Sequence, residues 1–134
     1  MKNATLILAA VTALVLSSCS TCPFGGKTTS KGKVEHVVLV WLKLPGNAAD
    51  RAALVAAAKR FQAEIKLIQH LSVGAALPSD RDIVDDSFDV GFIMRFANKA
   101  DMTAYEKHPV HVSTVKQTLM PIAKKVLVYD IGCE

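Results

Sequence analysis

The chain has 134 residues, of which 51% are hydrophobic and 21% are charged, and its formal net charge at pH 7 is +4. This weak positive balance is no argument for nucleic-acid binding, and the sequence has no basic patch interleaved with aromatic residues, so no nucleic-acid partner is expected. It is compatible with some attraction to an anionic lipid surface.

The first 18 residues have the features of an export signal. Lys2 supplies a positive charge, and residues 4–15 form an uncharged apolar run that is too short to span a bilayer comfortably. The run ends in Leu-Ser-Ser-Cys at residues 16–19, which resembles the lipobox of bacterial lipoproteins. In such proteins the signal is cut before the cysteine, and the cysteine carries fatty acids such as palmitate. We therefore expect a lipid anchor on Cys19, with a plain signal peptide as the alternative.

Residues 19–33 are rich in Ser, Thr, Gly and Lys, which predicts a flexible tether between the lipid and a domain at residues 34–134. An anchored protein of this kind faces the periplasm or the exterior of a bacterial cell envelope. Ser20 stands where an aspartate signals inner-membrane retention in some bacteria, so the outer membrane is favoured. Cys22 and Cys133 either pair outside the cytoplasm or remain separate thiols, and both alternatives stay open.

Residues 34–43 alternate in a way that predicts a strand with two apolar faces. We expect both faces to be buried. One face carries His36, Val38, Val40 and Leu42, and the other carries Val37, Leu39 and Trp41.

A helix is expected next, with Asp50 as its N-cap and its end near Gln69. Its apolar stripe consists of Leu54, Ala58, Phe61, Ile65 and Ile68. His70 would then lie at the negative end of the helix dipole.

Further strands are expected at residues 71–77, 89–96 and 123–131, with a broken helix at residues 100–120. This order predicts an α+β, ferredoxin-like β-α-β-β-α-β fold with a four-stranded antiparallel sheet and helices on one face. The other face keeps Val37, Leu39, Trp41 and Ile93, and no further element is left to cover them, so we expect a partner to do so.

The segment from Tyr105 to His111 concentrates the acid/base chemistry of the chain. A residue before proline is pushed out of the α region, so the helix should break at His108, and Pro109 suits the first turn of a new helix. His111 then lies in that first turn, where the helix dipole favours a neutral imidazole. Tyr105 and His111 are separated by about 120° on a continuous helix, and the break can bring them closer.

Four features of this chain occur in the order typical of the stress-responsive A/B barrel (Dabb) family. These are His36 in the first strand, residues 88–96, the Tyr105-x-x-His108-Pro109-x-His111 segment and residues 126–130. The chain resembles this family from about residue 34 to residue 131. The resemblance implies a homodimer that closes into a dimeric α+β barrel, with a pocket between the sheet and the helices of each subunit.

Within the family, the Tyr105–His111 segment is most similar to that of the plant polyketide cyclases that form olivetolic acid. That similarity implies acid/base roles for Tyr105 and His111, with His36 as a third member. The expected pocket residues are Val38, Val40, Phe61, Phe92, Met94 and His108.

Other sites are weaker candidates. His108 and His111 lack a third ligand for zinc, and the aspartates at positions 80, 82, 85 and 86 lack the pattern of an EF-hand. We therefore expect neither a metal nor an organic cofactor. The expected function is binding of a small hydrophobic ligand. The alternatives are a cofactor-independent cyclase or isomerase that uses Tyr105 and His111, and a structural dimer with no site.

Overall fold

The computed structural model describes residues 31–134. The expected export signal, the lipid attachment at Cys19, and the tether up to residue 30 with Cys22 lie outside the described residues. Pairing of Cys22 with Cys133 therefore stays an expectation. None of the helices formed by residues 31–134 is both long enough and apolar enough to cross a membrane.

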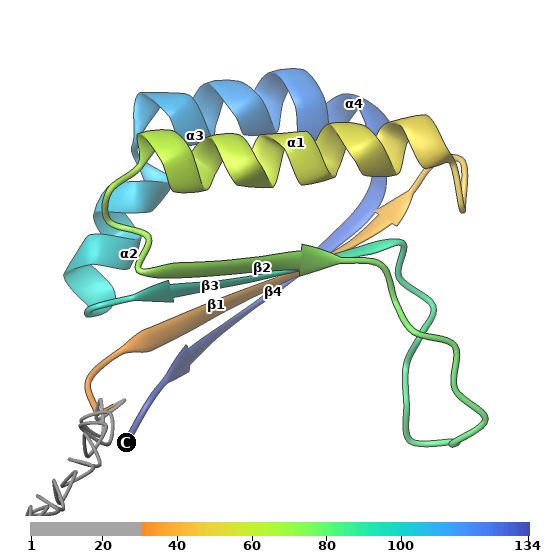
Figure 1. Ribbon diagram of the computed structural model, residues 1–134, viewed down its shortest axis with the longest axis horizontal. Coiled ribbons are helices and arrows are strands. Elements are labelled where there is room, and N and C mark those ends of the chain that lie inside the picture. Colours follow the sequence, from red (N-terminus) through yellow and green to blue (C-terminus); the bar gives the residue numbers. More distant parts are fainter. Residues whose placement is uncertain (1–30) are drawn as a thin grey trace, which may run out of the picture.

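The elements follow the predicted β-α-β-β-α-β order (Figure 1). Strand β1 (Val34–Leu42) and helix α1 (Ala48–Glu64) are followed by strands β2 (His70–Gly74) and β3 (Val90–Phe96). The second helical layer consists of α2 (Lys99–Glu106), α3 (Pro109–Thr114), the π-helix η1 (Val115–Leu119) and the short α4 (Met120–Ile122). Strand β4 (Ala123–Gly132) completes the sheet.

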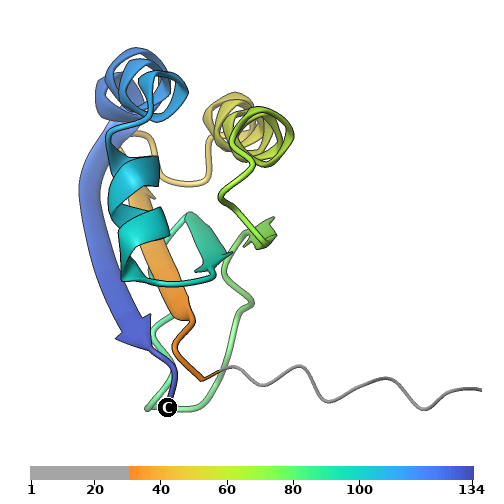
Figure 2. The same cartoon turned by 90° about the vertical axis from the view of Figure 1, so that its left-hand side faces the viewer.

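The sheet has the strand order β2-β3-β1-β4, and every neighbouring pair is antiparallel. Strand β1 is central, and its His36 lies opposite Met94 of β3 and Asp130 of β4. All the helices lie on one side of the sheet (Figures 1 and 2). The structure therefore confirms the predicted α+β, ferredoxin-like fold.

The core lies between the helices and the sheet face that points toward them, which we call the inner face. From α1 and the turn after it, the whole predicted stripe is buried, from Leu54 to Ile68. The sheet contributes alternate residues of its two central strands. These are Val34, Val38, Val40 and Leu42 of β1 and Val90, Phe92, Met94 and Phe96 of β3.

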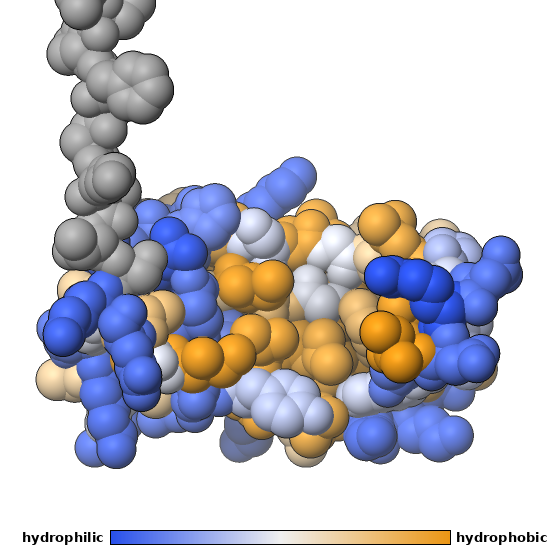
Figure 3. All heavy atoms as spheres, turned by 90° about the horizontal axis from the view of Figure 1, so that it is seen from below, coloured by the Kyte–Doolittle hydropathy of each residue, from blue (hydrophilic) through white to orange (hydrophobic). Residues whose placement is uncertain are grey.

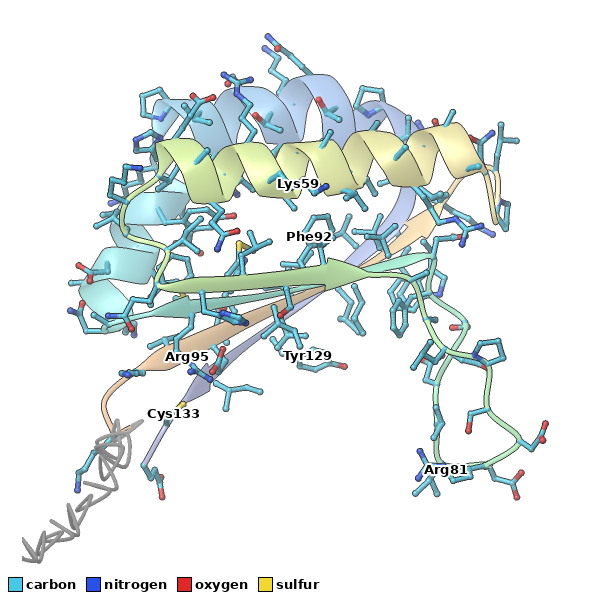
Figure 4. The ribbon with its side chains drawn as sticks, in the orientation of Figure 1. Lys59, Arg81, Phe92, Arg95, Tyr129 and Cys133 are labelled. Atoms are coloured by element: carbon cyan, nitrogen blue, oxygen red, sulfur yellow. The ribbon has the colours of Figure 1, made fainter. Side chains whose placement is uncertain are left out.

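The opposite side of the sheet, which we call the outer face, is open in the single chain. Its members are Val37, Leu39, Trp41, Ile93, Leu127, Tyr129 and Ile131. Ile93 is 45% exposed and Tyr129 is 52% exposed. Figure 3 shows this face as a largely hydrophobic surface, and Figure 4 shows Phe92 directed toward the helices and Tyr129 directed away from them. The expected burial of this second face of β1 therefore depends on a partner, because every helix packs on the inner face.

Four predicted details at the ends of elements are wrong. Asn47 caps α1, since its side-chain oxygen accepts the N–H of Asp50 at 2.9 Å, so Asp50 lies in the first turn. The helix ends at Glu64 and not near Gln69, because Ile65 adopts an extended conformation while its side chain stays in the core. His70 consequently opens β2 and has no role at a helix end, and β2 stops at Gly74.

Candidate functional site

Three polar rings from three different elements meet beneath the helices. His36 comes from the inner face of β1, Tyr105 from the last turn of α2 and His111 from α3. The ring centroids of Tyr105 and His111 are 4.4 Å apart, and those of His36 and Tyr105 are 5.9 Å apart. His36 and Tyr105 are only 6% and 1% exposed, so two of the three rings are removed from bulk water.

The break between α2 and α3 creates this arrangement. His108 has an extended conformation, with φ −64° and ψ 132°, as expected for a residue before proline. It acts as the N-cap of α3, because its Nδ1 accepts the N–H of Val110 at 3.3 Å, and Pro109 occupies the first turn. The new helix direction turns His111 toward Tyr105. His108 itself caps the helix and does not line the cavity described below, so its expected place in the pocket is wrong.

One hydrogen bond of the His111 ring defines its tautomer. Its Nδ1 lies 2.9 Å from the backbone carbonyl oxygen of Glu106. A carbonyl oxygen only accepts, so Nδ1 carries the hydrogen, and Nε2 of the neutral ring keeps a lone pair. Burial lowers the pKa of His111 below its ordinary value, against the opposing effect of the Glu106 carbonyl. His111 is therefore neutral at pH 7, as predicted, although burial rather than the helix dipole is the main cause.

Tyr105 supplies the complementary group. Burial raises the pKa of Tyr105, so the phenol stays protonated over the physiological range. Within residues 31–134, the structure shows no hydrogen bond from its hydroxyl to another group. A protonated phenol beside a neutral imidazole provides a hydrogen-bond donor and a base in the same small space.

His36 is held by a partner that the sequence did not indicate. Its Nδ1 lies 2.6 Å from Oδ1 of Asp130, and the Asp130 side chain is 42% exposed at the edge strand β4. A carboxylate accepts, so Nδ1 of His36 donates, and the pair fixes the orientation of the ring. The sequence pattern holds no local signal for this pair, because it depends on the sheet register, which places Asp130 directly opposite His36.

The rings line a cavity of about 50 Å³. Of the expected pocket residues, Val38, Phe61, Phe92 and Met94 are in its wall, whereas Val40 is not and is fully buried in the core. Two wall residues were missed, Val115 and Leu119, which lie in the π-helix η1. Their spacing of four and eight residues after His111 places them on the same helix face, and this spacing could have revealed them.

Metal ligands are not grouped in the part of the chain that the structure describes. Among residues 31–134, no three or more His, Cys, Asp or Glu side chains are placed to hold a metal ion. The polar groups in the cavity wall are the phenol of Tyr105 and the imidazoles of His36 and His111.

Comparisons with known proteins place this geometry in context. No curated protein sequence matches the chain. Among solved structures, a Dabb family protein with a ferredoxin-like fold from Mesorhizobium loti is 27% identical, with a TM-score of 0.62 over 75% of this chain and 96% of that one. A dimeric protein of ferredoxin-like fold from Bacteroides fragilis is 22% identical, with a TM-score of 0.62 over 76% of this chain and 97% of that one.

A hydroxynitrile lyase from Passiflora edulis has the same fold at 18% identity, with a TM-score of 0.65 over 74% of this chain and 91% of that one. The model of the stress-responsive A/B barrel domain (Dabb) matches residues 34–133, which is nearly all of the described chain. The chain therefore belongs to the Dabb family.

Proposed function

We propose that this protein binds a small, largely apolar molecule that carries one hydrogen-bond acceptor, such as a carbonyl, in the cavity of His36, Tyr105 and His111. The observation that carries the proposal is the grouping of three polar rings in the wall of one cavity, where the ring centroid of Tyr105 lies 4.4 Å from that of His111 and 5.9 Å from that of His36. Within the described residues the Tyr105 hydroxyl makes no hydrogen bond, and it is not among the polar atoms that are buried without a partner. A ligand acceptor in the cavity would give this hydroxyl a partner.

The size of the cavity limits the ligand. Its volume of about 50 Å³ is well below the roughly 150 Å³ of an engineered cavity that admits benzene. The ligand is therefore either very small or enters by displacing wall side chains such as Leu119 and Phe61. The first test is an NMR titration of the purified full-length chain with 2-pentanone as a carbonyl probe. Shifts confined to residues around the cavity would support the proposal, and their absence in Tyr105→Phe would assign the bond to the phenol.

Acid/base catalysis on such a ligand is the second candidate function. It is favoured by the neutral His111, whose Nε2 lone pair is free, beside the protonated Tyr105. His111 would accept a proton from a hydroxyl or from a carbon next to a carbonyl, while Tyr105 would donate a hydrogen bond to the developing oxyanion. The hydroxynitrile lyase among the structural relatives supports such a use of the fold. Deuterium exchange at the carbons next to the carbonyl of 2-pentanone, lost in His111→Ala, is the test.

The protein is further proposed to be a homodimer that pairs through the outer face of its sheet into a dimeric α+β barrel. Support comes from the exposed apolar residues of that face and from the dimeric relative of B. fragilis. Sedimentation of the full-length chain in mild detergent measures the dimer directly.

Anchoring to the bacterial envelope through a lipidated Cys19 is also a proposal, and it rests on the lipobox-like residues 16–19. Cys19→Ser should prevent signal cleavage at this site and move the protein out of the detergent-extracted membrane fraction. Treatment with globomycin should block processing of the unsubstituted chain. Identical processing and solubility of both forms would contradict the anchor.

A further inference from the structure

The connection between β2 and β3, residues 75–89, is unusually long for two neighbouring antiparallel strands. Most such hairpin loops contain about two to five residues. Here the loop leaves the sheet and projects on the side away from the helices, beyond the outer face (Figure 1). Arg81 lies near its far end (Figure 4).

Hydrogen bonds hold the loop in this extended position. The N–H of Ser79 donates to the Asp86 carboxylate at 3.0 Å, and this bond joins the outgoing and returning halves of the loop. At its base, Nε1–H of Trp41 donates to Oγ of Ser87 at 3.0 Å, which ties it to β1. These bonds join the two halves of the loop and attach its base to β1.

Two aliphatic side chains of the loop are almost entirely in water. Leu77 is 83% exposed and Ile83 is 90% exposed. A single exposed aliphatic residue needs no explanation. The position of this pair is informative, however, because the loop base continues the apolar outer face. Ala75 and Phe88 line a hollow of about 330 Å³ together with Val37, Leu39 and Ile93 of the sheet.

We infer that residues 75–89 form an arm that packs Leu77 and Ile83 against the outer face of a second copy of this chain. The inference rests on the proposed dimer. If two sheets pack together through their outer faces, an arm that projects beyond the outer face of one sheet reaches the outer face of the other. A two-fold axis makes the contact reciprocal, so each copy both gives and receives an arm.

The charge of the arm favours a protein partner over a lipid surface. The arm carries five aspartates, at positions 80, 82, 85, 86 and 89, against the single cation Arg81. Anionic lipid headgroups repel such a segment. The domain of a second copy repels it less, because residues 34–134 carry 12 cationic and 12 anionic side chains, and the excess positive charge of the chain lies in residues 1–33.

The test compares dimer dissociation constants of the full-length chain in mild detergent, measured by sedimentation. Leu77→Ser with Ile83→Ser should raise the dissociation constant at least about tenfold, because both side chains would lose their buried contacts. The matched control is Leu44→Ser, which removes a leucine that is 62% exposed in the β1–α1 connection. It should change the constant less than about twofold. Both variants should keep the melting temperature of the subunit, since these side chains bury little in the single chain.

A second measurement places the arm. A photoreactive benzoylphenylalanine at position 83 should yield a cross-linked dimer whose cross-link maps to the outer face of the other copy, and the same group at position 44 should not. An unchanged dissociation constant in the double variant would overturn the inference while leaving the dimer in place. Loss of vesicle binding in that variant, with an unchanged dimer, would overturn it in favour of a lipid contact. A monomeric unsubstituted chain would refute the proposed dimer, and the arm with it.

Discussion

The inner and outer faces of the sheet are both apolar, yet helices cover only the inner one. On the inner face, His36 is the one buried residue of β1 that is not aliphatic. Its Nδ1 pairs with Asp130, and its ring lies in the same cavity wall as Tyr105 and His111. The outer face has no comparable polar cluster at its centre. The closed face therefore holds the candidate site, and the open face has the composition of an interface.

The largest effect is expected from a charge on the outer face, which tests whether this face is the dimer interface. Leu39 is half-buried and points away from the helices, so Leu39→Arg leaves the core of the subunit intact but places an unpaired charge in the proposed dimer. We expect a monomer, since a buried unpaired charge costs roughly 3–5 kcal/mol. Sedimentation of the full-length chain measures the loss. The control is Val112→Arg, at a residue of α3 that is 52% exposed, which should remain dimeric. A dimeric Leu39→Arg chain would show that the outer face is not the interface.

Removing single polar atoms from the inner face separates binding from folding. Tyr105→Phe deletes a hydroxyl that has no partner within residues 31–134, so the free energy of unfolding should change by less than about 0.5 kcal/mol. Affinity for a carbonyl probe should fall about fivefold, the ratio that corresponds to one net hydrogen bond of about 1 kcal/mol. His111→Ala also loses the bond to the Glu106 carbonyl, and should cost about 1–3 kcal/mol of stability. Thermal melts beside a ligand titration give both quantities. Large destabilisation by Tyr105→Phe, with no selective loss of binding, would indicate a purely structural role.

The pH dependence of stability provides a more specific test of the inner face. The pKa of His111 is lower in the folded state than its ordinary value of 6.5. Below about pH 6.5, the unfolded chain therefore binds more protons at this residue than the folded chain does, and stability falls as pH falls. His111→Gln, which does not titrate, should show a smaller loss of stability than the unsubstituted chain between about pH 7 and 5. Chemical denaturation at several pH values measures the difference. Parallel curves for the two proteins would contradict burial of a neutral imidazole.

The sequence predicted the fold well because the strands follow a period of two, so that alternate residues of each strand lie on the inner face. It also predicted that His36, Tyr105 and His111 come together, since Pro109 dictates a break whose geometry is local. It failed at the end of α1, where Ile65 and Ile68 continue the helical spacing although the chain has left the helix. It also missed Asp130, because the pairing of His36 with β4 depends on the sheet register, a long-range property that periodicity does not contain.

The last prediction concerns a buried polar atom between the helices and the inner face, outside the cluster of three rings. Thr114 is 5% exposed, and its hydroxyl oxygen is buried without a hydrogen-bond partner within the described residues. Valine has nearly the same shape and lacks the hydroxyl, so Thr114→Val should raise the free energy of unfolding by about 1 kcal/mol. Ser113→Ala is the control, because Oγ of Ser113 donates to the Val110 carbonyl at 3.2 Å, and its loss should leave stability unchanged or slightly lower. Urea denaturation resolves a difference of this size. If Thr114→Val is instead less stable, the hydroxyl has a partner in the native protein, such as a buried water or a ligand in the adjoining space lined by Phe61, Val115 and Leu119. That result would extend the polar part of the inner face beyond the three rings.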